Sequence, residues 1–191
     1  MQLNPAPQPL RRLVEDVEAR LPEAEGKPIR VHIRPNLHSH RGKLHSETAG
    51  EPVHAACDIQ KRLMFLDESL ESQAGEFRRI LIHEIFHFAW ARVGNEARGS
   101  FAELLVREFG RNARGELGWS AEYRKDELRQ LKPSARNRKR WSDYVCESFC
   151  DTAAWVYSGL RTHPEFTLSQ RHRGARARWF SEYFSDRKLF I

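Results

Sequence analysis

The chain of 191 residues contains 40% hydrophobic and 30% charged residues, a balance typical of a folded globular protein and not of a disordered or fibrous one. We find no apolar run long enough to cross a membrane and no secretory signal pattern at the N-terminus, so we expect a cytoplasmic protein. The cysteines, Cys57, Cys146 and Cys150, are few and odd in number, which predicts reduced thiols and not a disulfide framework.

The net charge of +6 is unevenly distributed along the chain. Residues 1–95 are neutral overall, and residues 96–191 carry the whole excess. Within this basic half, lysines and arginines mix with tryptophan over 132–141 and 171–179, as in proteins that hold single-stranded nucleic acid. Nucleic acid is therefore a candidate partner of the C-terminal half, and the alternative is a solvated surface that favours solubility.

The first half of the chain changes from helical to strand periodicity. Leu10, Leu13, Val14 and Val17 form one stripe of an amphipathic helix. After Pro28, apolar and polar residues alternate, as in a strand whose two faces differ. The predicted elements are a helix over 8–20, a strand over 29–34, a long loop over 35–52, and short strands over 53–59 and 62–67.

The second half shows helical signals only. Gly94 and Asn95 provide a stop for a helix over 73–92. Ser100 with Glu103 matches a capping box, and Ser142 begins an apolar helix. The predicted helices cover 73–92, 100–110, 120–131, 142–159 and 169–184. This order predicts a single α+β domain over 1–191, with a small sheet in 1–95 and a helical half in 96–191.

Residues 83–87, HEIFH, match the pattern H-E-x-x-H. On a helix, His83 and His87 project from one face about one turn apart, which suits two imidazole nitrogens on one zinc ion. Glu84 is turned by roughly 100° from His83, so it reaches a bound water and not the metal. Zinc lowers the pKa of such a water to roughly 7, and a neighbouring carboxylate can then take its proton.

The segment around this motif, RRILIHEIFHFAWARV, is apolar on nearly every face, which predicts a buried helix. Two histidines and a glutamate are costly to bury unless something binds them. The sequence therefore favours a metal site over a pair of core histidines with satisfied hydrogen bonds.

The motif resembles that of the zincin metallopeptidases. The metzincin branch would require Gly at 90 and His at 93, where this chain has Trp90 and Val93. The gluzincin branch takes a downstream glutamate as third ligand, commonly followed four residues later by Asp. The resemblance implies a zincin-like fold, one zinc ion as cofactor, and hydrolysis of peptide bonds in a peptide or protein substrate with Glu84 as general base.

Three Glu-x-x-x-Asp pairs follow the motif: Glu122/Asp126, Glu147/Asp151 and Glu182/Asp186. The middle pair lies in the apolar segment YVCESFCDTAAWVYSG, and two carboxylates on one face of a buried helix need a cation or strong donors. We therefore assign Glu147 as the third metal ligand, with an ion pair between Glu147 and an arginine as the alternative. By resemblance to gluzincins, Asp151 accepts a hydrogen bond from the far nitrogen of His83. Glu103 and Glu108 are fallback ligands.

The resemblance also implies parts of the substrate site. In zincins an edge strand beside the motif helix pairs with an extended peptide, and residues 62–67 hold that place in order; the alternative is an inner strand. Zincins often use a Tyr or His to stabilise the oxyanion, and Tyr144, Tyr157 and His163 are candidates, with Tyr144 three residues before Glu147. Cys146 and Cys150 share a helix face, either close to the zinc or as small buried thiols.

Other functions share some of these features. SprT-like proteases, which act on DNA–protein crosslinks, take a third histidine shortly downstream, where this chain offers Arg98 and Gly99 but no histidine. ImmA/IrrE-like regulatory proteases use a later acidic ligand in an alanine-rich helix, which residues 147–154 resemble loosely. A nucleic-acid-binding module with a vestigial zinc site is the alternative outside the enzymes.

Overall fold

The computed structural model describes residues 1–3, 8–40, 43–45, 51–131 and 137–191. The amphipathic helix over 8–20 is confirmed as α1 (Gln8–Arg20), which buries Leu10, Val14 and Val17. The expected strands are found as β3 (Arg30–Arg34), β7 (Ala55–Asp58) and β8 (Leu63–Asp67).

The main sheet has the strand order β1-β3-β8-β7. Strand β1 (Gln2–Leu3) runs parallel to β3, β3 runs parallel to β8, and β7 is antiparallel to β8. Val31 and Met64 are opposite one another in register and fully buried, as expected for the sheet face that meets the core. Because β8 has a partner on each side, the expectation that residues 62–67 form the edge strand is wrong, and β7 is the edge.

The segment 35–52 was expected to be a loop but contains three short strands. They are β4 (His38–His40), β5 (Lys43–His45) and β6 (Glu51–Pro52), which form an antiparallel sheet in the order β5-β4-β6. Strands of two or three residues are too short for the alternation of polar and apolar positions that identifies a strand in a sequence. The sequence therefore contains no periodic pattern that would have identified these strands within 35–52.

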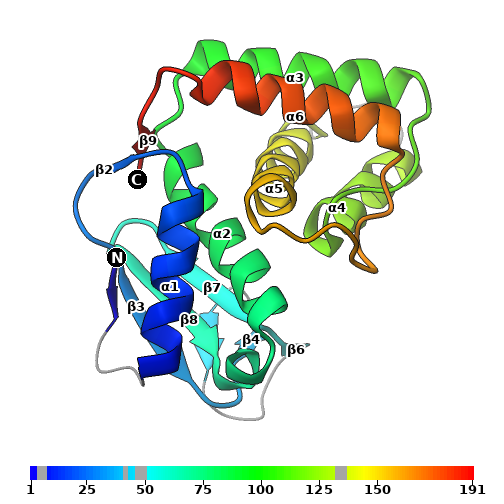
Figure 1. Ribbon diagram of the computed structural model, residues 1–191. Helices are drawn as coiled ribbons and strands as arrows, with labels where there is room; N and C mark the ends of the chain where they lie inside the picture. Colours follow the sequence, from blue (N-terminus) through cyan, green and yellow to red (C-terminus); the bar gives the residue numbers. More distant parts are fainter. Residues whose placement is uncertain (4–7, 41–42, 46–50, 132–136) are drawn as a thin grey trace.

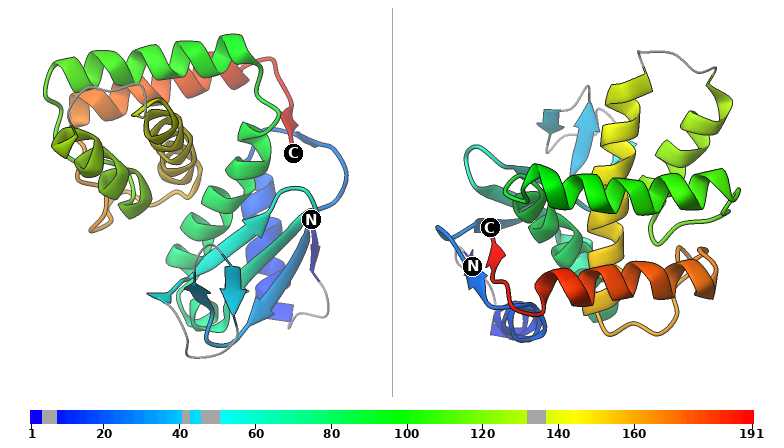
Figure 2. Two further views of the ribbon diagram at one scale, coloured as in Figure 1. Left: turned by 180° about the vertical axis from the view of Figure 1, so that it is seen from behind. Right: turned by 90° about the horizontal axis from the view of Figure 1, so that it is seen from above.

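Beyond the sheet, the short 3-10 helix η1 (Glu68–Ser72) precedes the helices α2 (Ala74–Trp90), α3 (Asn95–Gly110), α4 (Trp119–Gln130), α5 (Asn137–Tyr157) and α6 (Gln170–Phe184). Helix α2 contacts α1 and the edge strand β7 on one side and α5 on the other (Figure 1). Helix α5 is the centre of the helical half, because it packs against α2, α3, α4 and α6. The view from above shows α3 and α6 crossing α5 (Figure 2).

Two helices begin earlier than their sequence signals indicate. Helix α3 starts at Asn95, and the hydroxyl of Ser100 donates to the carbonyl of Ala97 at 3.0 Å inside the helix, so it caps nothing. Helix α5 starts at Asn137 and incorporates the end of the basic run that we expected to precede it. Residues 132–136 of that run lie outside the described residues.

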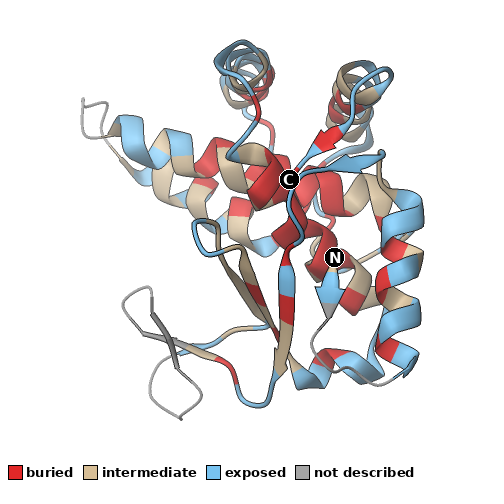
Figure 3. Ribbon diagram, turned by 90° about the vertical axis from the view of Figure 1, so that its left-hand side faces the viewer, coloured by how far each residue is buried: buried red, intermediate tan, exposed pale blue. Residues whose placement is uncertain are grey.

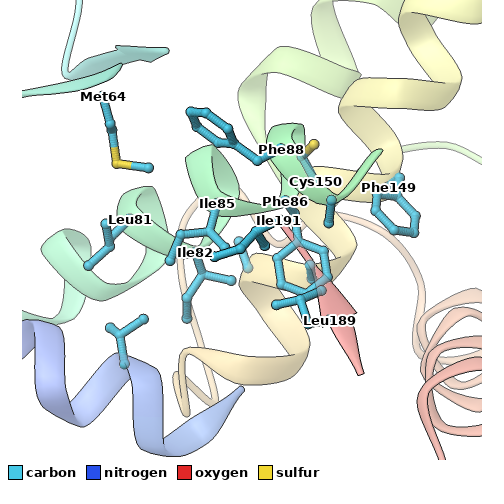
Figure 4. Packing of buried hydrophobic residues seen from close by; sticks show 14 of the residues in the cluster. Met64, Leu81, Ile82, Ile85, Phe86, Phe88, Phe149, Cys150, Leu189 and Ile191 are labelled. Atoms are coloured by element: carbon cyan, nitrogen blue, oxygen red, sulfur yellow. The ribbon is translucent and has the colours of Figure 1, made fainter. Parts of the chain in front are cut away.

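Most of the buried hydrophobic residues of both halves form one cluster around α2, and a smaller cluster contains Leu117, Phe166 and Leu168. Buried residues are the red bands on the ribbon in Figure 3. Figure 4 shows part of the larger cluster, with Phe86 of α2 beside Phe149 of α5 and the C-terminal residues Leu189 and Ile191. These last residues belong to or follow β9 (Leu189–Phe190), which pairs in parallel with β2 (Ala24–Glu25). Of the helices in the described ranges, none combines the length and apolar character needed to cross a membrane.

A cluster of buried charges joins the helices of the second half. Arg176 of α6 is fully buried, and its guanidinium contacts Glu108 of α3 at 2.6 Å and Glu116 at 2.7 Å. Lys125 of α4 and the hydroxyl of Tyr144 of α5 bind the same Glu116 carboxylate at 2.8 and 2.6 Å. Arg176 is thereby removed from the basic surface that the sequence offered to nucleic acid.

Candidate metal centre

Helix α2 carries His83 and His87 on the side that faces Glu147 of α5. The helix is buried along most of its length, and only small fractions of His83 and Glu84, 8% and 7%, are exposed. The ring nitrogens Nε2 of His83 and His87 lie 3.1 Å apart, as expected for histidines one turn apart that point at the same place.

Helix α5 brings Glu147 to the same point. Its Oε2 lies 3.5 Å from Nε2 of His83 and 3.8 Å from Nε2 of His87. Its other oxygen, Oε1, contacts the guanidinium of Arg124 on α4 at 3.3 Å. Both expectations for Glu147 thus have a counterpart, because one oxygen faces the histidines and the other pairs with an arginine.

The three atoms suit the geometry of a zinc ion. Ligands about 2.0–2.1 Å from a tetrahedral zinc are separated from one another by about 3.3–3.4 Å. The distances of 3.1, 3.5 and 3.8 Å found here bracket that value. Two imidazoles and one carboxylate are also the donor set that catalytic zinc sites use, with a position left over for water or substrate.

The electrostatics of the pocket favour a positive charge. Burial alone would lower the pKa of His83, but the charge and hydrogen bond of Asp151 raise it well above 6.5. Burial alone would raise the pKa of Glu147, but its hydrogen bond with His83 and the charge of His87 hold it at about 2. The carboxylates therefore stabilise a positive charge at this place. The charge can be a proton on the histidines or a metal ion that displaces this proton.

Asp151 lies behind His83 and fixes its orientation. Nδ1 of His83 donates to Oδ1 of Asp151 at 2.7 Å, as the resemblance implied. The other oxygen, Oδ2, accepts from the backbone amide of Ala121 in the first turn of α4 at 3.1 Å. Gly118 permits this approach, because a Cβ at that residue would lie 2.2 Å from the Asp151 carboxylate. Gly118 is a site residue that no sequence signal marked.

Glu84 is directed toward the edge strand β7. One of its carboxylate oxygens lies within 4.8 Å of ligand atoms of both histidines, and Glu84 lines the same cavity as Cys57 of β7. Burial raises the pKa of this Cys57 thiol, and so does the charge of Glu84. Glu84 therefore lies between the histidines and β7.

No protein-family model matches the chain, and none of the curated proteins or solved structures matches it either. A functional assignment of this chain therefore rests on its residues and their geometry.

The expected oxyanion residues do not lie at this site. Tyr144 is wrong for that role, because it is fully buried and its hydroxyl is bound to Glu116 in the charge cluster of the helical half. Tyr157 packs on Phe86, and Nε2 of His163 lies 3.0 Å from Glu76. The fallback ligands are also elsewhere: the structure places Glu108 against Arg176 and leaves Glu103 exposed.

Two cavities flank the centre and share His83, Glu84 and Ser120. The first, about 370 Å³, extends along residues 52–55 to Trp119. The second, about 510 Å³, extends along Ala56 and Cys57 of β7 to Cys146. The candidate metal centre thus lies where two hollows meet beside an edge strand.

Proposed function

We propose that the chain is a zinc-dependent metallopeptidase of gluzincin type. The observation that carries the proposal is the convergence of Nε2 of His83, Nε2 of His87 and Oε2 of Glu147 at zinc-ligand separations in a buried pocket. Glu147 takes the place of the third histidine of the SprT-like pattern, and this favours the gluzincin alternative.

Each residue of the site has a role in peptide hydrolysis. His83, His87 and Glu147 would hold the zinc ion, which supplies a Lewis acid for the substrate carbonyl and for the attacking water. Glu84 accepts a proton from that water and passes it to the nitrogen of the leaving amine. Asp151 fixes the Nδ1–H tautomer of His83, so that Nε2 stays free for the metal.

An extended polypeptide is the substrate that suits the strand and the cavities beside this site. Strand β7 is the edge of the main sheet, and an edge strand offers unpaired backbone groups to an added strand. Residues of β7 line both cavities beside the site, so a peptide paired with this strand would place one bond near Glu84. In this proposal β7 replaces residues 62–67 as the strand that binds substrate.

Metal analysis of purified protein tests the proposal. We expect one zinc ion per chain in the parent and little or none in Glu147→Ala, because two histidines alone do not complete the site. Glu182→Ala is the matched control, since Glu182 belongs to another Glu-x-x-x-Asp pair but is exposed at the end of α6. Zinc retained by Glu147→Ala with the affinity of the parent would contradict the assigned ligand.

A second variant tests the group behind His83. Asp151→Asn keeps the size of the side chain but removes the charge that stabilises the His83 ring, so we expect zinc affinity to fall about 10–100-fold. The dissociation constant is measured by competition with a chelator, with the exposed Asp186→Asn as control. An unchanged constant would mean that Asp151 serves the helix α4 terminus alone.

A further inference from the structure

The two histidines of the centre differ in what holds their far nitrogens. His83 has the Asp151 carboxylate at 2.7 Å, whereas Nδ1 of His87 faces two sulfurs, Cys146 Sγ at 3.6 Å and Cys150 Sγ at 3.5 Å. Within the described part of the chain, these sulfurs are the only hydrogen-bonding partners of that nitrogen. A histidine that binds metal through Nε2 carries its proton on Nδ1, so here the proton is donated to sulfur.

The two sulfurs are also placed to react with one another. Cys146 and Cys150 are one turn apart on α5, and their sulfurs and Nδ1 of His87 all lie within 4.8 Å. The α-carbons of residues four apart on a helix are separated by about 6 Å, inside the range of 4.4–6.8 Å that disulfides span. The β-carbons at this spacing are about 5–6 Å apart and a disulfide needs about 3.5–4.5 Å, so closing the bond requires rotation of both side chains and a local unwinding of this turn of α5.

Access to the pair is one-sided. Cys146 is partly exposed and lines the larger of the two cavities beside the metal centre. Cys150 is fully buried in the hydrophobic cluster, part of which is drawn in Figure 4. A small oxidant can therefore reach Cys146 first, and the buried Cys150 is the second thiol, which reacts with the oxidised Cys146.

We propose that Cys146 and Cys150 are positioning residues for His87 and a site of reversible oxidation by hydrogen peroxide, which weakens metal binding at the neighbouring centre. Peroxide converts the Cys146 thiol to a sulfenic acid and releases water. The Cys150 sulfur then attacks the Cys146 sulfur, the S–O bond breaks, and a second water leaves. In total two thiols lose two electrons and two protons to one peroxide, and an added dithiol reverses the reaction.

The effect on the metal follows from the lost acceptor. A disulfide sulfur is a poorer hydrogen-bond acceptor for Nδ1 than the sulfur of a thiol or thiolate. The His87 ring then loses the contact that holds its Nε2 toward His83 and Glu147, the residues that would bind the metal with it. This inference rests on the proposed metal centre, and loss of such a supporting bond typically reduces metal affinity about 10–100-fold.

The test uses the zinc-loaded full chain, treated with hydrogen peroxide and then with dithiothreitol. We expect a mass loss of two hydrogens, a Cys146–Cys150 crosslink in peptide mapping, and release of zinc to a chromophoric chelator at chelator concentrations that leave the reduced protein loaded. Dithiothreitol should restore both thiols and zinc binding. Cys57→Ser should form the same Cys146–Cys150 crosslink as the parent, whereas Cys150→Ser and Cys150→Ala should form none.

The outcomes separate the two proposals. A crosslink that leaves zinc affinity unchanged, or peroxide that modifies Cys57 alone, would overturn the inference while the metal centre stands. A parent chain that binds no zinc before treatment would refute the proposed function and with it the effect on metal. Peptide mapping of that metal-free chain would still show whether Cys146 and Cys150 form the oxidation site.

Discussion

Replacing Glu84 by glutamine should abolish peptide hydrolysis and leave the zinc content unchanged. The amide has the size of the carboxylate but cannot take a proton from water, and the loss of a general base typically lowers kcat by about 10²–10⁴-fold. Glu84 is not among the three residues whose atoms converge as zinc ligands, so the metal should remain. The measurements are cleavage of an unstructured protein such as casein and metal analysis of the same sample.

The control for this variant is Glu103→Gln, which changes an exposed glutamate of α3 and should preserve both activity and zinc. The variant also separates the catalytic role from a structural one, because only the former leaves the metal in place. Hydrolysis by Glu84→Gln at the rate of the parent would show that the proposed mechanism is wrong.

The largest effect on stability should come from Glu116→Gln. Glu116 is fully buried and binds Arg176, Lys125 and Tyr144, so its loss leaves the buried Lys125 without its carboxylate and the buried Arg176 with Glu108 alone. Breaking a buried ion pair in this way usually costs about 3–5 kcal/mol of unfolding free energy. Urea denaturation at pH 7 measures it, and Asp126→Asn, which removes an exposed carboxylate 4.0 Å from Arg129, should change it by at most about 1 kcal/mol.

The same carboxylate should make stability depend on pH. Burial would raise the pKa of Glu116, but the charges of Arg176 and Lys125 lower it from 4.5 to about 2. Because the folded pKa is the lower one, its stabilising effect is complete above about pH 4.5 and is lost as the pH falls through 2. The difference in unfolding free energy between the parent and Glu116→Gln should therefore shrink on acidification, and a constant difference would argue against the ionised carboxylate as its cause.

Much of the fold could be predicted because it depends on local patterns. The stripe of α1 and the alternation of β3 are properties of short segments, and both elements are found where expected. The start of α3 could not be predicted from Ser100 and Glu103, because a capping box also occurs by chance on a helix surface. In α3 the Ser100 hydroxyl donates to a carbonyl within the helix, so this residue does not mark the start of the helix.

The candidate site divides in the same way. The spacing within HEIFH and the burial of two carboxylates on α5 pointed to His83, His87 and Glu147, which the fold brings together. Arg124, Gly118 and the sulfurs around His87 depend on how α4 and α5 dock, which no local pattern encodes. Tyr144 was misjudged for the same reason, since its partner Glu116 lies in a connection between helices that carries no signal.

The pairing of β2 with β9 links residues 24–25 with residues 189–190 and so closes almost the whole chain into a ring. The entropy of closing a ring grows only slowly with its length, so this contact costs little more at equilibrium than a nearer one. Its influence is on kinetics, because contacts between distant residues form late and slow the search for the native state. During refolding we therefore expect Leu189 and Ile191 to be the last residues to pack into the hydrophobic cluster.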